Sequence, residues 1–113
     1  MHEYSIVQAL YDSVAAQAAA RHAVRVHGVE VRIGELSGVD VGLLETAWNT
    51  FRVRTLCEDA PMTVTVVPVC WTCEACGADG PRGGIRRCAA CGGPLRLVEG
   101  DDIVLERIVM EVP

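Results

Sequence analysis

The chain has 113 residues, half of them hydrophobic, and a formal charge of −5; its ten basic residues are all arginine. This length fits one domain with at most a small appended lobe, and the apolar content is sufficient for a core, which excludes a disordered chain. The acidic charge and the few aromatic residues argue against nucleic-acid binding. The lack of a polybasic stretch likewise argues against binding to anionic membranes.

Targeting signals and disulfides are both disfavoured. The first residues contain neither a basic n-region nor an apolar h-region, and no apolar run approaches the roughly 20 residues of a membrane span. We therefore expect a cytoplasmic protein. The six cysteines could form three disulfides, but C-x2-C pairs in a reducing compartment indicate metal ligands, which leaves disulfides as the minor alternative.

Five stretches carry the periodicity of regular secondary structure. Apolar residues recur with helical spacing in the first, alanine-rich stretch, and they alternate with polar residues where strands are expected. In chain order, the predicted elements are a helix over residues 4–26, a strand over 29–34, a helix over 41–56, a strand over 62–66 and a strand over 103–112. The inward parity of the last strand switches between Leu105 and Ile108, which predicts a bulge or a twist near Glu106 and Arg107.

This order predicts an α+β fold in which two helices pack on a three-stranded β-sheet, with a zinc-ribbon-like lobe inserted before the last strand. We assign residues 1–69 together with 102–113 to the α/β domain and residues 70–101 to the lobe. The lobe is too short to bury a core of its own and needs a metal as a staple. The unprotected edge strands of so small a sheet leave homodimerisation or strand exchange open.

Four cysteines in the lobe, Cys73, Cys76, Cys88 and Cys91, have the spacing C-x2-C-x11-C-x2-C. Structural zinc takes four ligands in a tetrahedron, and two C-x2-C turns supply them as two pairs. A glycine follows each pair and allows a tight turn whose backbone amides point at the thiolates. All three histidines lie at or before His27, so the site is predicted to be closed and structural rather than catalytic.

The two remaining cysteines are less easily assigned. Cys70 and Cys73 also form a C-x2-C pair, but Glu74 rather than glycine follows it, so Cys70 is interpreted as a flanking thiol or a spare ligand. Cys57 lies near the end of the second predicted helix and is interpreted as a small buried hydrophobic residue.

His2, next to Met1, has the position needed for a second kind of metal site. The α-amine of Met1, the deprotonated backbone nitrogen of His2 and the His2 imidazole can chelate one metal in fused rings, and such nitrogen donors suit Ni²⁺ or Cu²⁺. Glu3 could add its amide or carboxylate. From spacing alone, an incidental histidine is the more frequent explanation, and Glu3 also fits a helix N-terminus. His22 and His27 are expected on the solvated surface.

Asp40 precedes the second predicted helix and is placed as its N-cap. A carboxylate oxygen of Asp40 could also approach the amino terminus if the fold brings the two together. The N-cap is the role that the sequence favours, and the two roles are compatible if one oxygen serves each.

Three segments together resemble the HypA/HybF family of nickel metallochaperones in hydrogenase maturation. They are Met1–Val7 (MHEYSIV) opening a helix, Gly34–Asp40 (GELSGVD) after the first strand, and the doubled Cys-x-x-Cys-Gly. The resemblance implies a nickel site on His2, to which the chelate above adds Met1, with Glu3 and Asp40 as accessory ligands or supporting groups. The resemblance also implies structural zinc on Cys73, Cys76, Cys88 and Cys91. Because the proposed nickel residues all lie in the α/β domain, that domain would be the nickel-binding domain.

The resemblance also implies a route for the metal. Nickel would be cargo that passes, with help from the GTPase HypB, to the large subunit of [NiFe]-hydrogenase, and in some organisms toward urease maturation. No histidine lies beside the cysteines here, so a ligand exchange at the zinc site with pH has no support in this sequence.

Two other functions remain as alternatives. A zinc-ribbon module that binds proteins, with His2 incidental, is the first, although the helix–strand segment before the cysteines disfavours a bare ribbon. A metal-dependent enzyme is the second. The sequence contains no nucleophile–base pair at motif spacing, so we predict that the chain is not an enzyme.

Overall fold

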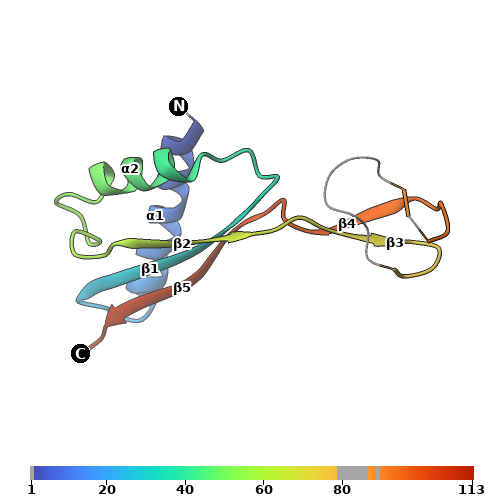
Figure 1. Ribbon diagram of the computed structural model, residues 1–113. Coiled ribbons are helices and arrows are strands. Elements are labelled where there is room, and N and C mark those ends of the chain that lie inside the picture. The colour runs from blue at the N-terminus through green and yellow to red at the C-terminus, as the bar shows by residue number, and fades with distance from the viewer. Residues whose placement is uncertain (1, 79–86, 89) are drawn as a thin grey trace.

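A computed structural model describes residues 2–78, 87–88 and 90–113, except the side chain of His2. The elements in chain order are α1 (His2–Ala20), β1 (Arg25–Gly34), α2 (Val41–Phe51), β2 (Met62–Val67), β3 (Cys70–Cys73), β4 (Leu95–Glu99) and β5 (Ile103–Glu111). Figure 1 shows two parts, a layer of α1, α2 and three strands, and a smaller lobe with β3 and β4. Neither described helix is long and apolar enough to cross a membrane.

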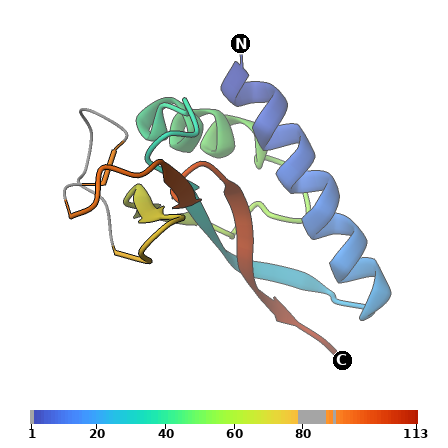
Figure 2. The same ribbon diagram turned by 90° about the vertical axis from the view of Figure 1, so that its right-hand side faces the viewer.

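The larger sheet has the strand order β2-β1-β5. Its central strand, β1, pairs in parallel with β2 and antiparallel with β5. Val29, Val31 and Ile33 of β1 alternate toward the helices and are buried, as expected for a strand whose successive side chains point to opposite faces. Both helices lie on this one face of the sheet (Figures 1 and 2). The predicted α+β fold is thereby confirmed.

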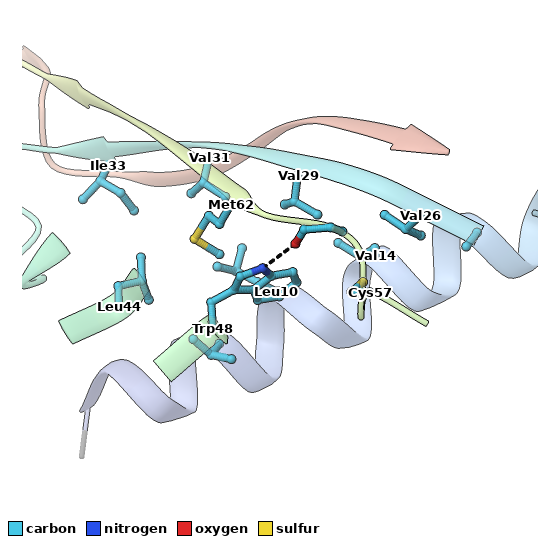
Figure 3. Close-up of a cluster of buried hydrophobic side chains, with 13 residues drawn as sticks. Leu10, Val14, Val26, Val29, Val31, Ile33, Leu44, Trp48, Cys57 and Met62 are labelled. Carbon is cyan, nitrogen blue, oxygen red and sulfur yellow. Dashed lines mark hydrogen bonds between the residues drawn. The ribbon is translucent and has the colours of Figure 1, made fainter. Parts of the chain in front are cut away.

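The core is centred on Trp48 of α2, whose side chain is fully buried. Its indole Nε1 donates to the Ala60 carbonyl oxygen at 2.9 Å, so burial leaves no polar atom of this ring unpaired (Figure 3). The other buried apolar residues of the core come from α1, α2, β1, β2 and the segment between α2 and β2; they are Val7, Leu10, Val14, Ala18, Val26, Val29, Val31, Ile33, Leu44, Cys57, Ala60 and Met62.

Both helices end earlier than predicted. α1 stops at Ala20 because the chain turns at His22, whose φ of 53° lies in the left-handed region, and Ala23 N donates back to Ala18 O at 2.9 Å. As a result, β1 begins at Arg25, four residues before the predicted start of this strand. α2 stops at Phe51.

Of the bulge or twist predicted in the last strand, the structure shows the bulge. Glu30 pairs with Arg107 and the next residue of β1, Val31, pairs with Leu105, which leaves Glu106 as the extra residue. A second irregularity, at His27 between the pairs of Val26 and Gly28, has no counterpart in the prediction.

The chain enters and leaves the lobe through a narrow neck. A Cβ on Gly34 would lie 2.4 Å from the carbonyl atoms of Gly100, and a Cβ on Gly100 would lie 2.6 Å from the Cα of Val69. Gly100 also has a φ of 106°, which favours glycine. Across the neck, the Glu35 carboxylate accepts from Val69 N at 2.8 Å. Close backbone contacts therefore join the lobe to the α/β layer.

Candidate metal centre

The four predicted zinc ligands come together at the end of the β3–β4 hairpin. The sulfurs of Cys73, Cys76, Cys88 and Cys91 all lie within 4.8 Å of one another. The closest approaches are 3.4 Å between Cys73 and Cys91 and 3.6 Å between Cys76 and Cys88. A tetrahedron with Zn–S bonds of about 2.3 Å has edges of about 3.8 Å, so one Zn²⁺ fits between the sulfurs.

The first Cys-x-x-Cys-Gly turn is held by two backbone hydrogen bonds. Cys73 N donates to Ala78 O at 2.8 Å, and Gly77 N donates back to Cys73 O at 3.0 Å. The turn also directs Cys76 N at the Cys73 sulfur, 3.5 Å away. The amide-to-thiolate arrangement expected from the glycine position is thus present.

The second turn repeats the same pattern. Cys88 N donates to Gly93 O at 2.9 Å, and Gly92 N donates to Cys88 O at 2.8 Å. Gly77 and Gly92 have φ values of 76° and 74°, so each turn uses its glycine in the left-handed conformation. Two equivalent local turns, facing each other across the hairpin, therefore form the four-sulfur cluster.

The turns also set the protonation of the thiols. The Cys76 amide, followed by that of Ala75, lowers the pKa of Cys73 to about 6. The amides of Cys91 and Ala90 likewise lower the pKa of Cys88. The Gly93 amide favours the Cys91 thiolate, but hydrogen bonding to the other thiols outweighs it and raises the pKa of Cys91 to about 12. The cluster thus pairs two readily formed thiolates with thiols that a cation would have to deprotonate.

The other two cysteines lie apart from this cluster. Cys70 belongs to β3, where it pairs with Glu99, and the four-sulfur group in the described part of the chain does not include it. Cys57 is fully buried in the α/β core, in agreement with its interpretation as a small hydrophobic residue. Burial raises the pKa of Cys57 to about 11, against a smaller opposing effect of Arg52, so this thiol stays protonated at neutral pH.

The predicted nickel site is described only in part. Met1 and the side chain of His2 lie outside the described residues, while the backbone of His2 begins α1. The packing of α1 against α2 brings the other two residues together: Glu3 Oε2 accepts from Asp40 N at 3.3 Å. This contact joins residues 37 positions apart. The family resemblance placed both residues at one nickel site, but no local pattern in the sequence indicated this direct contact.

Asp40 has the N-cap role that the sequence favoured. Its Oδ1 accepts from Leu43 N at 3.0 Å, and its φ and ψ of −82° and 110° are those of an N-cap. One carboxylate oxygen of Asp40 therefore caps α2 beside the start of α1.

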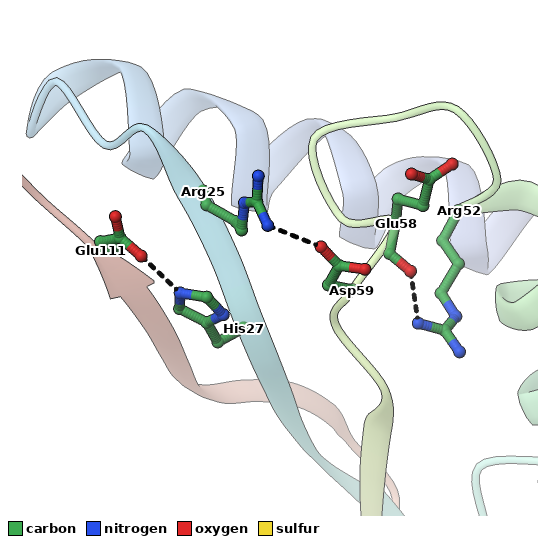
Figure 4. A network of polar contacts seen from close by, with 6 residues as sticks. All are labelled: Arg25, His27, Arg52, Glu58, Asp59 and Glu111. Carbon is green, nitrogen blue, oxygen red and sulfur yellow. Dashed lines mark hydrogen bonds and ion pairs between the residues drawn. The ribbon is translucent and has the colours of Figure 1, made fainter.

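The histidines at the other end of α1 are on the surface, as predicted. His22 is exposed in the turn after α1, and His27 Nε2 lies 2.9 Å from Glu111 Oε1 on β5 (Figure 4). Figure 4 also shows Arg25 paired with Asp59 at 3.1 Å, across from β1 to the turn before β2. Both pairs are solvent-exposed and contribute little to stability.

Comparison with known proteins gives one consistent result. Residues 1–110 match the family described as "Hydrogenase/urease nickel incorporation, metallochaperone, hypA". The chain is 38% identical over 107 residues to the hydrogenase maturation factor HypA of Nitrosospira multiformis, covering 93% of each chain. It is 36% identical over 114 residues to that of Wolinella succinogenes, covering 98% of this chain and 96% of the relative.

Solved structures agree with the sequence relatives. The solution structure of the nickel metallochaperone HypA from Helicobacter pylori superposes with a TM-score of 0.73 at 27% identity, covering 98% of both chains. A second solution structure of a HypA protein gives a TM-score of 0.78 at 27% identity, covering 100% of this chain and 98% of the other.

Proposed function

The chain belongs to the HypA family of nickel-incorporating metallochaperones, and we propose that it binds Ni(II) at its N-terminus and delivers it to the large subunit of [NiFe]-hydrogenase. Proteins of this family are maturation factors, not enzymes, and act in hydrogenase maturation. We further propose that the lobe holds a structural Zn(II). The observation that carries the nickel assignment is the contact between Glu3 and Asp40, which brings two of the four predicted site residues together.

The start of α1 suits a chelate that includes the His2 backbone nitrogen. The first amides of a helix have no acceptor within the helix, so loss of the His2 amide proton breaks no helical hydrogen bond. The helix N-terminus itself carries partial positive charge, which disfavours a cation. The carboxylate of Glu3, in the first turn of α1, offsets that charge, and the backbone N of Asp40 donates to it. We therefore assign Met1 and His2 as nickel ligands and Glu3 and Asp40 as ligands or supporting groups.

Such a site fits a carrier better than a permanent holder of metal. A chelate at the start of a helix is open to attack by the ligands of an acceptor, as transfer requires. Its formation releases protons, so nickel affinity falls as pH falls. The same nitrogen donors bind Cu²⁺ more tightly than Ni²⁺, so selectivity must come from metal availability and partner contacts. The partners we propose are the GTPase HypB, the hydrogenase large subunit and, in some settings, urease maturation proteins.

The zinc-ribbon lobe has a different role in this proposal. Four thiolates close the coordination sphere of Zn²⁺ and leave no open position for a substrate, which is the arrangement of structural sites. When bound, zinc supplies the cross-link between the two turns. The chain itself positions the sulfurs through the paired backbone bonds at Cys73 and Cys88. We therefore propose that zinc stays with the lobe while nickel is passed on.

A calorimetric Ni²⁺ titration of the zinc-loaded, untagged protein tests the assignment. We expect about one Ni²⁺ per chain, and we expect His2→Ala to lose it while keeping zinc. His27→Ala is the matched control, because His27 is an exposed histidine paired with Glu111 far from the start of α1. Equal nickel binding by the wild type and His2→Ala would contradict the proposal. It would leave the alternative, a zinc-ribbon protein-interaction module without nickel transfer, as the leading account.

The two roles of Asp40 can be separated by two substitutions. Asparagine is as good an N-cap as aspartate but lacks the charge, whereas alanine loses both. If Asp40 assists nickel, Asp40→Asn will weaken nickel binding at unchanged stability, and Asp40→Ala will in addition cost about 1 kcal/mol of stability. Unchanged nickel affinity in Asp40→Asn would restrict Asp40 to the N-cap role. Transfer itself is tested by mixing nickel-loaded protein with apo large subunit and measuring where the metal resides.

A further inference from the structure

β5 is an edge strand with a long open side. Within the described residues it pairs only with β1, and it runs for nine residues from Ile103 to Glu111 (Figure 1). It contains no proline or lysine, the residues that usually block edges. An edge of this kind presents a row of unpaired backbone donors and acceptors to another strand.

The hydrogen bonds at the two ends of β5 show which residues face this open side. Asp102 O accepts from Gly34 N at 2.7 Å, and Glu111 O accepts from Val24 N at 2.8 Å, so both carbonyls point toward β1. Backbone groups alternate in direction along an antiparallel strand. Counting inward from both ends therefore shows that four residues have their backbone N–H and C=O groups on the open side: Ile103, Leu105, Ile108 and Met110.

The bulge makes these two counts compatible. Counting from Asp102 selects odd-numbered residues and counting from Glu111 selects even-numbered ones, and the extra residue Glu106 lies where the two counts meet. The same shift keeps the four open-side residues on the helix-covered face, where they are half-buried against the core. The residues between them lie exposed on the other face: Val104, Glu106, Arg107 and Val109.

The sequence of β5 is self-complementary about its centre. Read in both directions from the midpoint between Glu106 and Arg107, the strand IVLERIVM places apolar residues at equal distances and two opposite charges at the centre. We propose that two copies of this chain pair antiparallel through the open side of β5, about a two-fold axis at this midpoint. The paired residues would be Ile103 with Met110, Leu105 with Ile108, Val104 with Val109, and Glu106 with Arg107.

This pairing is possible only because β5 has the bulge. In a regular strand, neighbouring residues point to opposite faces, so a two-fold axis between them would oppose an inward side chain to an outward one. Here every inward residue meets an inward residue of the second copy. The pairs of Ile103 with Met110 and of Leu105 with Ile108 are also those whose backbone groups point outward, so each would exchange two hydrogen bonds. The result is one continuous six-stranded sheet with all helices on the same face.

Charge supports the same register. Glu106 already pairs with Arg32 at 3.4 Å, and Arg107 pairs with Glu30 at 3.4 Å, on the open face of the sheet. Setting Glu106 opposite Arg107 of the second copy joins these pairs into one row of alternating charge across the axis. A shift of the register by two residues in either direction would instead place both charged residues opposite valine, leucine or isoleucine.

The helix-covered side of the edge has room for a second copy. A groove of about 340 Å³ lies between the end of α1 and β5. Gln17 and Arg21 form one wall, and the other is formed by Leu105, Ile108 and Met110 together with Glu106 and Arg107 at the bulge. The groove lies next to the proposed axis. Leu105 and Ile108 of the second copy would enter it and cover the half-buried apolar residues of β5.

Sedimentation equilibrium of the zinc-loaded full chain, with two matched lysine variants, tests the interface. Val104 lies on β5 and Val66 on β2, the opposite edge of the same sheet, and they are 46% and 54% exposed. We expect a concentration-dependent dimer whose dissociation constant rises by about tenfold or more in Val104→Lys and is unchanged in Val66→Lys. A wild type that stays monomeric to millimolar concentration, or a loss of the dimer only in Val66→Lys, would overturn the proposal.

Disulfide trapping tests the register independently. In the proposed pairing Val104 and Val109 are a pair without backbone hydrogen bonds, with Cα atoms about 4.5 Å apart, which a disulfide can span. In a Cys70→Ser background, Val104→Cys and Val109→Cys should each stay uncrosslinked alone and form a disulfide dimer when mixed. Equal crosslinking of a single variant and of the mixture would mean random collision and reject this register. Circular dichroism and zinc content confirm that each variant is folded.

Discussion

The α/β layer buries apolar side chains from two helices and a sheet, whereas the described residues of the lobe bury only two side chains, Cys73 and Cys88. We therefore expect the layer to gain its stability from the hydrophobic effect and to fold without a metal. The lobe has no such core, and its four gathered sulfurs lead us to expect that a metal stabilises it. If so, one chain combines two sources of stability, and removal of either should affect mainly its own region.

Removal of zinc is the largest expected disturbance and should affect the lobe alone. Structural zinc contributes on the order of 10 kcal/mol to small domains. With chelator or in Cys88→Ser, amide signals of β3 and β4 should collapse toward unfolded positions, while those of β1 and α2 remain dispersed in the NMR spectrum. The matched control is Cys70→Ser, which leaves the four-sulfur cluster intact and should keep the lobe folded. Loss of the β1 signals on chelation would disprove the independence of the layer.

Truncation of Trp48 in the core should destabilise the α/β layer and leave the lobe intact. Trp48→Ala removes a fully buried ring and its hydrogen bond to Ala60, at a cost of about 3–5 kcal/mol. Urea denaturation followed by far-UV circular dichroism should show this loss. The zinc content at low urea should stay at one per chain. Trp71→Phe, a change at the half-buried tryptophan of β3, should leave the urea midpoint of the layer unchanged.

The neck is where the two regions depend on each other. A Cβ on Gly34 would overlap the carbonyl of Gly100 at 2.4 Å, so Gly34→Ala must displace the end of β1 or the strand leaving the lobe. We expect a loss of about 3 kcal/mol in thermal denaturation. Gly38→Ala is the control, because Gly38 has a positive φ but no atom within 4 Å of its Cβ position, and it should cost only about 1 kcal/mol. Equal costs would mean that contact at the neck is unimportant.

The local features of both regions were predictable from the sequence. The two Cys-x-x-Cys-Gly turns were predicted because each is built within six residues, from sulfur spacing and a glycine at positive φ. The bulge was predicted because it leaves a parity shift between Leu105 and Ile108. The α2 N-cap at Asp40 was predicted for the same reason, since its partner, Leu43, is three residues away.

Features that depend on the rest of the fold were not predictable. The first helix was predicted to reach residue 26, but Val26 is buried as part of β1. The turn that separates the two elements uses His22 at positive φ, where a glycine would have been a clear signal. β3 and β4 were missed because they are short and half-exposed. The contact of Glu3 with Asp40 needs the packing of two helices and has no local signature.

The smallest expected effect is a loss of stability at high pH, and it concerns only the α/β layer. Burial raises the pKa of Cys57 from its ordinary value of 9.0 to about 11. Between these values the unfolded chain has released the thiol proton while the folded chain still holds it, so the free energy of unfolding falls as pH rises. We expect a loss of about 2 kcal/mol from pH 9 to pH 11 that is absent in Cys57→Ala, measured by urea denaturation at each pH. The wild type and Cys57→Ala differ only at this residue, so the titration of all other groups cancels in the comparison. Parallel curves of unfolding free energy against pH for the two proteins would show that the buried thiol does not contribute.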